Sequence, residues 1–72
     1  MVMSRYAVMI EKTPTGYSGF VPDLPGCIAT GASITEVEER LRTGIALHVQ
    51  AMRQDGDPVP EPTTVVRELE VA

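Results

Sequence analysis

Several residue types are scarce in this 72-residue sequence. It has no tryptophan, three other aromatic residues and a single cysteine. One cysteine, Cys27, excludes an intrachain disulfide. No apolar run approaches the roughly 20 residues that span a bilayer, and a signal peptide is not predicted, because Arg5 and then Glu11-Lys12 interrupt the N-terminal stretch. We therefore expect a cytosolic protein without membrane contact.

Positive charge is also scarce. Six lysines and arginines oppose ten acidic residues, which gives a net charge of −4 and a pI near 4.7. The basic residues are scattered, so direct nucleic acid binding is not expected. Acidic residues concentrate at the C-terminal end, with Arg67 as their only counter-charge, at Asp55, Asp57, Glu61, Glu68 and Glu70. This distribution favours a basic partner and repels a polyanion.

Residues that carry chemistry are few. His48 is the only histidine and lies beside an apolar helical stripe, where a packing role is favoured over catalysis. Cys27 follows a Pro-Gly turn and is interpreted as a core residue that has only His48 as a possible base. Neither a zinc site nor a set of metal-binding carboxylates is suggested by the spacing. We expect no enzyme, no metal and no cofactor.

The length allows one small domain, residues 1–72. A chain of this size buries only about 60% of the surface that it exposes when unfolded. Stability from its own core is expected to be marginal, so a homodimer or a higher homo-oligomer is predicted.

The first half of the chain predicts three strands. Residues 5–10 alternate with apolar side chains on both faces, and 13–16 form a turn that returns the chain in a strand at 17–21. Pro22 ends that strand because proline cannot donate to a ladder, and Pro25-Gly26 turns the chain into a short strand at 27–30.

The second half predicts a helix and a last strand. Ser33 and Glu36 have the spacing of a capping box, so a helix should begin at Ile34, and its apolar stripe continues to Met52. Gly56 is placed to end the helix. Alternating prolines then predict an extended connector, and residues 63–71 are interpreted as a strand.

The predicted fold is therefore α+β, with the order β-β-β-α-β and one helix on one face of a single mixed sheet. A right-handed crossover gives the strand order 3-2-1-4. One helix covers one face only, so Ala7, Met9 and Val66 should lie on the open face and call for another protein surface.

Three segments carry a resemblance to a known family. Residues 16–31 with their PDLPG core, the helix start and the tail DGDPVPEP at 55–62 resemble, in that order, the HicB-type antitoxins of toxin-antitoxin systems. The sequence departs from the pattern at Val37, where alanine is common, and it ends at Ala72 without the DNA-binding domain of longer members, as in a short form of the family.

The resemblance implies a truncated ribonuclease-H-like fold and a function. The protein would be the antitoxin of a type II toxin-antitoxin system that binds and inhibits a small, basic, RNA-cleaving toxin of the HicA type. The alternative is an oligomeric structural or regulatory module of the same fold without a toxin partner. An RNA or phosphoester hydrolase is disfavoured by the charge and the lack of a catalytic set.

Partner contacts are predicted at five positions. Met9 represents the open face, Glu68 and Glu70 the acidic end, and Asp23 and Leu24 the tip of the PDLPG loop. For Asp23 and Leu24 a structural role in the loop is equally favoured. Scaffold roles in turns and caps are predicted for Gly16, Pro22, Pro25, Gly26, Ser33 and Glu36.

Overall fold

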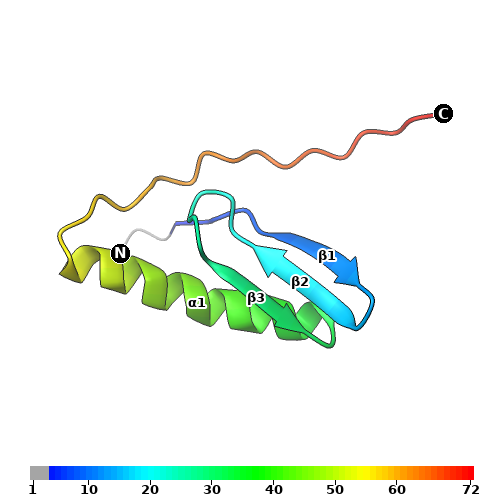
Figure 1. Ribbon diagram of the computed structural model, residues 1–72. Coiled ribbons are helices and arrows are strands. Elements are labelled where there is room, and N and C mark those ends of the chain that lie inside the picture. The colour runs from blue at the N-terminus through cyan, green and yellow to red at the C-terminus, as the bar shows by residue number, and fades with distance from the viewer. Residues whose placement is uncertain (1–3) are drawn as a thin grey trace.

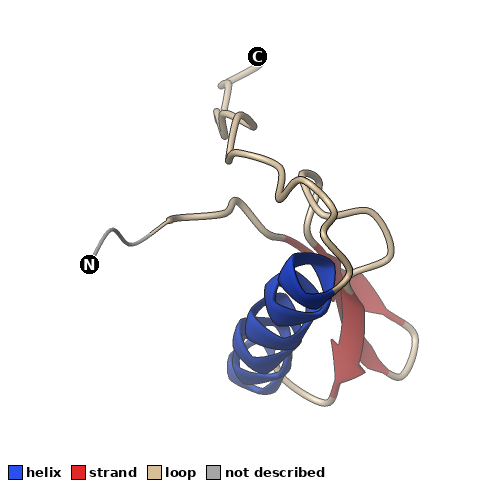
Figure 2. Ribbon diagram, turned by 90° about the vertical axis from the view of Figure 1, so that its left-hand side faces the viewer, coloured by secondary structure: helices blue, strands red, loops and turns tan. Residues whose placement is uncertain are grey.

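A computed structural model describes residues 4–72. Three strands, β1 (Met9–Thr13), β2 (Gly16–Phe20) and β3 (Ile28–Gly31), form an antiparallel sheet in the order β1-β2-β3. One long helix, α1 (Ile34–Gln54), packs across one face of this sheet, and the chain after it leaves as an extended segment (Figures 1 and 2). The protein is thus an α+β protein with one covered and one open sheet face.

The first hairpin closes with Pro14-Thr15 between the paired residues Thr13 and Gly16. Pairing stops at Met9 and Phe20, so the first strand lies later in the chain than residues 5–10, where the sequence placed it. Pairing stops there because Val21, which follows Phe20, donates its N–H to the Cys27 carbonyl at 3.1 Å. From Val21 the chain enters the PDLPG loop and no longer runs beside residues 5–8.

Both ends of α1 have the expected caps. Ser33 accepts a hydrogen bond from the Glu36 N–H at 3.1 Å, and the helix begins at Ile34 as predicted. At the other end, Gly56 has φ +74°, and the N–H groups of Gly56 and Asp57 donate to the carbonyls of Arg53 and Met52. This is a Schellman motif, in which the left-handed residue is glycine because a side chain would be strained there.

The core lies between the sheet and the first half of the helix. Its buried members are Val21, Leu24, Cys27, Val37 and Leu41. Gly19, at the centre of β2, lets the helix approach, because a Cβ there would come within 2.9 Å of side-chain atoms of Val37 and Leu41. Towards the C-terminal end of α1 the packing thins to half-buried side chains such as Ile45 and Val49.

The predicted fourth strand is absent from the described chain. Residues 63–71 pair with no strand, so the sheet is antiparallel, and the mixed sheet with order 3-2-1-4 is wrong for the single chain. The chain instead passes the start of the sheet, where the Tyr6 hydroxyl donates to the Pro60 carbonyl at 2.6 Å. It then runs past the PDLPG loop and away from the body (Figure 1).

Candidate partner-binding surface

The open face of the sheet carries an apolar row that crosses all three strands. The register places Met9 opposite Phe20 and Phe20 opposite Ile28, so the three side chains point to the same face. Ile10, Gly19 and Ala29 form the neighbouring row, which points to the helix. Met9 and Phe20 are each 40% exposed and Ile28 is 74% exposed. We call Met9, Phe20 and Ile28 the open-face row.

Polar side chains continue this face. Glu11, Ser18 and Thr30 are aligned by the same register, two residues further along the strands. The face therefore has an apolar half next to the PDLPG loop and a polar half next to the β1–β2 turn. A contiguous apolar row bordered by polar groups is the usual composition of a protein-binding surface.

Asp23 makes structural hydrogen bonds, and its partners lie in the C-terminal segment and not in its own loop. Its carboxylate accepts hydrogen bonds from the N–H of Thr63 at 3.2 Å and of Thr64 at 3.1 Å, and from both hydroxyls at 3.1 and 2.9 Å. These bonds, led by the one from the Thr64 N–H, hold the pKa of Asp23 below its usual value. Asp23 thus anchors the C-terminal segment to the loop.

Leu24, the second residue of the loop tip, is fully buried in the core. The Leu24 N–H donates to the Val21 carbonyl, and its carbonyl accepts from the Cys27 N–H at 3.0 Å. Its side chain is not available to a partner, so of the two roles weighed for Leu24 the structure has the packing role. Pro25 and Gly26 are exposed beside it, and Gly26 has φ +88° as a turn glycine.

The remaining predicted partner residues are exposed but lie apart. Met9 lies in the open-face row, whereas Glu68 and Glu70 lie on the extended C-terminal segment. Phe20 and Ile28 were missed by the sequence analysis. A hairpin that closes at Thr13 and Gly16 places Phe20 opposite Met9, so the turn alone predicts this pair. The position of Ile28 opposite Phe20 depends on the length of the PDLPG loop.

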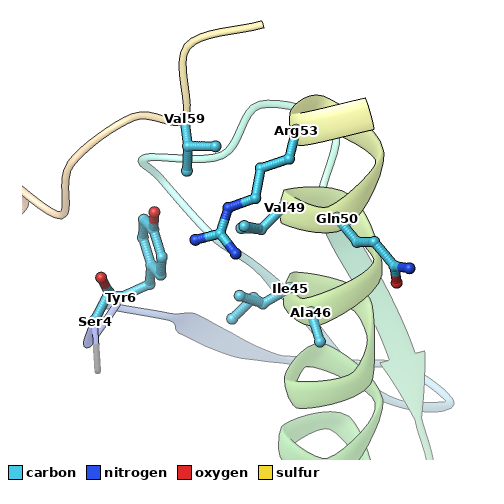
Figure 3. A pocket seen from close by; sticks show the side chains of 8 residues that line it. All are labelled: Ser4, Tyr6, Ile45, Ala46, Val49, Gln50, Arg53 and Val59. Carbon is cyan, nitrogen blue, oxygen red and sulfur yellow. The ribbon is translucent and has the colours of Figure 1, made fainter. Parts of the chain in front are cut away.

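A groove runs along the other side of the molecule, between residues 4–8 and the helix. Its wider part, about 360 Å³, is lined by Tyr6, Val49 and Arg53 among others, and Arg53 extends from the helix towards the Tyr6 ring (Figure 3). A narrower part of about 250 Å³ continues it between Val8 and Leu41. Half-buried apolar side chains such as Ile45 and Val49 form part of the walls, and exposed polar and charged side chains such as Arg53 form the rest.

The residues with catalytic potential do not converge. His48 is half-buried on the helix. Cys27 is buried, and desolvation raises the pKa of its thiol, which disfavours the reactive thiolate. Within residues 4–72 we find no cluster of three His, Cys, Asp or Glu side chains that could hold a metal ion. Over the same residues, no helix has the length and hydropathy needed to cross a membrane.

Comparison with known proteins gives consistent results. The model of a family described as HicB_like antitoxin of bacterial toxin-antitoxin system matches residues 6–71. A UPF0150 protein of Synechocystis is 30% identical over 68 residues, covering 93% of this chain and 86% of the relative. A UPF0150 protein of Archaeoglobus fulgidus is 36% identical over 56 residues, with 74% and 81% covered.

A longer relative and a solved structure complete the comparison. An uncharacterized 14.9 kDa protein of Haemophilus phage HP1 is 34% identical over 56 residues, which are 78% of this chain but only 42% of the phage protein. A chain of a solved HicA3 and HicB3 toxin-antitoxin complex superposes with a TM-score of 0.70 at 30% identity, covering 83% of this chain and 70% of that one. The protein described here belongs to the HicB-like antitoxin family of bacterial toxin-antitoxin systems.

Proposed function

We propose that this protein is an antitoxin that binds a small, basic, HicA-type toxin and blocks its RNA-cleaving activity. The observation that carries the proposal is the uncovered open-face row, Met9, Phe20 and Ile28, on a chain of this family. The similarity to a chain of a HicA3 and HicB3 complex supports the choice of partner.

The mechanism requires only association. A net charge of −4 draws a basic protein towards the surface, and the apolar row supplies contact area once the two proteins meet. We propose no catalysis, no cofactor and no direct nucleic acid binding by the antitoxin itself. Because the toxin acts on RNA, the pair would work in the cytoplasm.

The experiment is capture of the neighbouring toxin. The small open reading frame beside this gene is co-expressed with the tagged protein, and growth, pull-down and RNA cleavage are measured. We expect the antitoxin to restore growth, to co-purify with the toxin and to suppress cleavage. Failure to bind any product of the neighbouring gene would instead favour the stand-alone oligomeric module.

A surface variant localises the contact. Ile28→Asp places a charge in the open-face row at a side chain that is 74% exposed, so the fold should tolerate it. We expect at least a tenfold weaker affinity for the toxin, because the carboxylate would be desolvated in the complex. Leu47→Asp, at an exposed apolar residue on the helix, is the matched control and should bind as the unchanged protein does. Equal binding by both variants would exclude the open face as the contact.

The truncated ribonuclease-H-like arrangement implied by the family needs a strand beside β1. The described chain supplies none from its own C-terminal segment.

A further inference from the structure

The C-terminal residues 65–71 form an extended arm with an unsatisfied apolar side. Val65, Leu69 and Val71 share one side by the two-residue alternation of extended chain, and they are 68%, 85% and 90% exposed. Past Thr64 we find no hydrogen bond from the arm to the body within the described residues. We call residues 65–71 the C-terminal arm.

A second extended segment lacks partners as well. Residues 4–8 continue the line of β1, yet no backbone hydrogen bond to them is found within residues 4–72, because Val21 bonds to Cys27 instead. Tyr6, Ala7 and Val8 are nevertheless half-buried. A strand edge whose N–H and C=O groups have no partner in the protein is a template for another strand.

The groove described above lies beside this edge. A strand added next to residues 4–8 would direct alternate side chains into the groove between Tyr6, Val8, Ile45 and Val49. The apolar side of the arm has the alternation needed to fill it. Arg67 falls on the same side of the arm as Val65 and Leu69, and Glu38 lines the narrower part of the groove, whereas Glu68 and Glu70 point to the other side of the arm.

The arm of the same chain is directed elsewhere. The segment before it crosses the end of the sheet at Tyr6 and is fastened to the PDLPG loop by the four hydrogen bonds of Asp23. Beyond that point the arm departs from the body in both views (Figures 1 and 2). To lie along its own residues 4–8 it would have to reverse at Thr64 and lose this anchor.

We propose that two copies of the protein exchange their C-terminal arms. Residues 65–71 of each copy pair as a strand with residues 4–8 of the other, with Val65, Leu69 and Val71 in the groove. The contact is isologous, so one set of residues closes a two-fold dimer, and each sheet gains a fourth strand beside β1 from the partner. This dimer uses a different surface from the open-face row and does not depend on the toxin.

The first test is the mass in solution. The unchanged protein should scatter light at micromolar concentration as a species of about twice 7.8 kDa. Leu69→Asp with Val71→Asp should give the mass of one copy while the helical circular dichroism is kept, because both side chains are at least 85% exposed in the single chain. Leu47→Asp, which adds a charge at an exposed apolar residue outside the arm and the groove, should remain a dimer. A monomeric unchanged protein, or a dimeric double variant, would overturn the proposal.

The second test identifies which copy supplies the strand. A benzoylphenylalanine photo-crosslinker replaces Leu69, and isotope-labelled and unlabelled copies are mixed after unfolding and refolding together. We expect crosslinked peptides that join position 69 to residues in or near 4–8, half of them pairing one labelled with one unlabelled copy. Crosslinks only within one isotope would mean that the arm folds back on its own chain. Crosslinks that avoid the groove would place the arm elsewhere, and either result rejects the exchange.

Discussion

At the scale of single residues, Asp23 fixes the position of the C-terminal segment at Thr63 and Thr64. One carboxylate accepts from two N–H groups and two hydroxyls of Thr63 and Thr64, about forty residues away in the sequence. A charged acceptor suits this role, because it bonds more strongly than a neutral one and accepts without having to donate. Asp23 thus anchors the C-terminal segment to the PDLPG loop, whereas the next residue, Leu24, belongs to the core.

The Asp23 anchor predicts a dependence on pH. The pKa of Asp23 is lowered in the folded protein, so the anchor is fully effective above the unfolded-state pKa of about 3.9 and is lost as the pH falls through the lower folded-state pKa. NMR titration should give Asp23 a pKa below that of an unstructured peptide. The Thr63 and Thr64 amides should lose protection from hydrogen exchange over the same pH range.

A substitution tests the same anchor at neutral pH. Asp23→Asn leaves one carbonyl oxygen for four donors and should release the Thr63 and Thr64 amides to rapid exchange. Glu61→Gln removes the same charge at an exposed position and is the control, in which protection should remain. Unchanged protection in Asp23→Asn would show that the Pro60 contact alone fixes the tail.

At the scale of elements, two glycines where the helix packs on the rest of the domain differ in how much room they leave for a side chain. A Cβ on Gly19 would lie 2.8 Å from Val37 and 2.9 Å from Leu41, whereas a Cβ on Gly44 would meet only the Cys27 sulfur at 3.6 Å. Gly19→Ala should therefore destabilise the fold by about 1–3 kcal/mol through overpacking. Gly44→Ala should stabilise it by about 0.5–1 kcal/mol, since alanine is preferred in a helix interior. Urea unfolding of the pair checks both signs.

The helix start makes a second prediction at this scale. Ser33→Ala removes the oxygen that accepts from the Glu36 N–H, at a typical cost of about 1 kcal/mol. In a domain of this size that corresponds to a melting temperature lower by about 4–8 °C. Thr43→Ala removes a hydroxyl from an exposed position in the middle of the helix and should not lower the melting temperature. Toxin binding at low temperature should be kept in both variants.

The elements differ in how far the sequence could predict them. The helix was placed correctly because Ser33, Glu36 and Gly56 act on backbone groups within a few residues of themselves. The first strand was placed too early, since apolar alternation at 5–10 continues beyond the point where β2 can pair. The alternation at 63–71 predicts extended chain, which is observed, but it carries no information on whether a partner strand is in the same chain.

At the scale of the whole molecule, the candidate surface exists because a single helix covers only one of the two faces of the sheet. The sequence predicted an open apolar face and placed Met9 on it, because a single helix cannot cover both sides. It did not give Phe20, which the first hairpin places opposite Met9, or Ile28, whose position depends on how the PDLPG loop sets the register of β2 and β3. It also grouped Asp23 and Leu24, which the folded loop separates into an anchor and a core residue.

Charge at this scale predicts how fast the toxin is captured. Glu68 and Glu70 lie on the outer side of the alternating arm, away from Leu69 and Val71, so reversing both charges should leave the dimer and the melting temperature nearly unchanged. Association with a basic toxin should slow, because long-range attraction acts mainly on the encounter rate, while the dissociation rate set by the open-face row stays similar. Stopped-flow measurements at several ionic strengths test this. The association rate of the unchanged protein should fall steeply as salt shortens the Debye length, and the association rate of Glu68→Lys with Glu70→Lys should fall less with added salt. If the charge reversal instead raised the dissociation rate and left the salt dependence intact, the two glutamates would lie within the toxin contact itself.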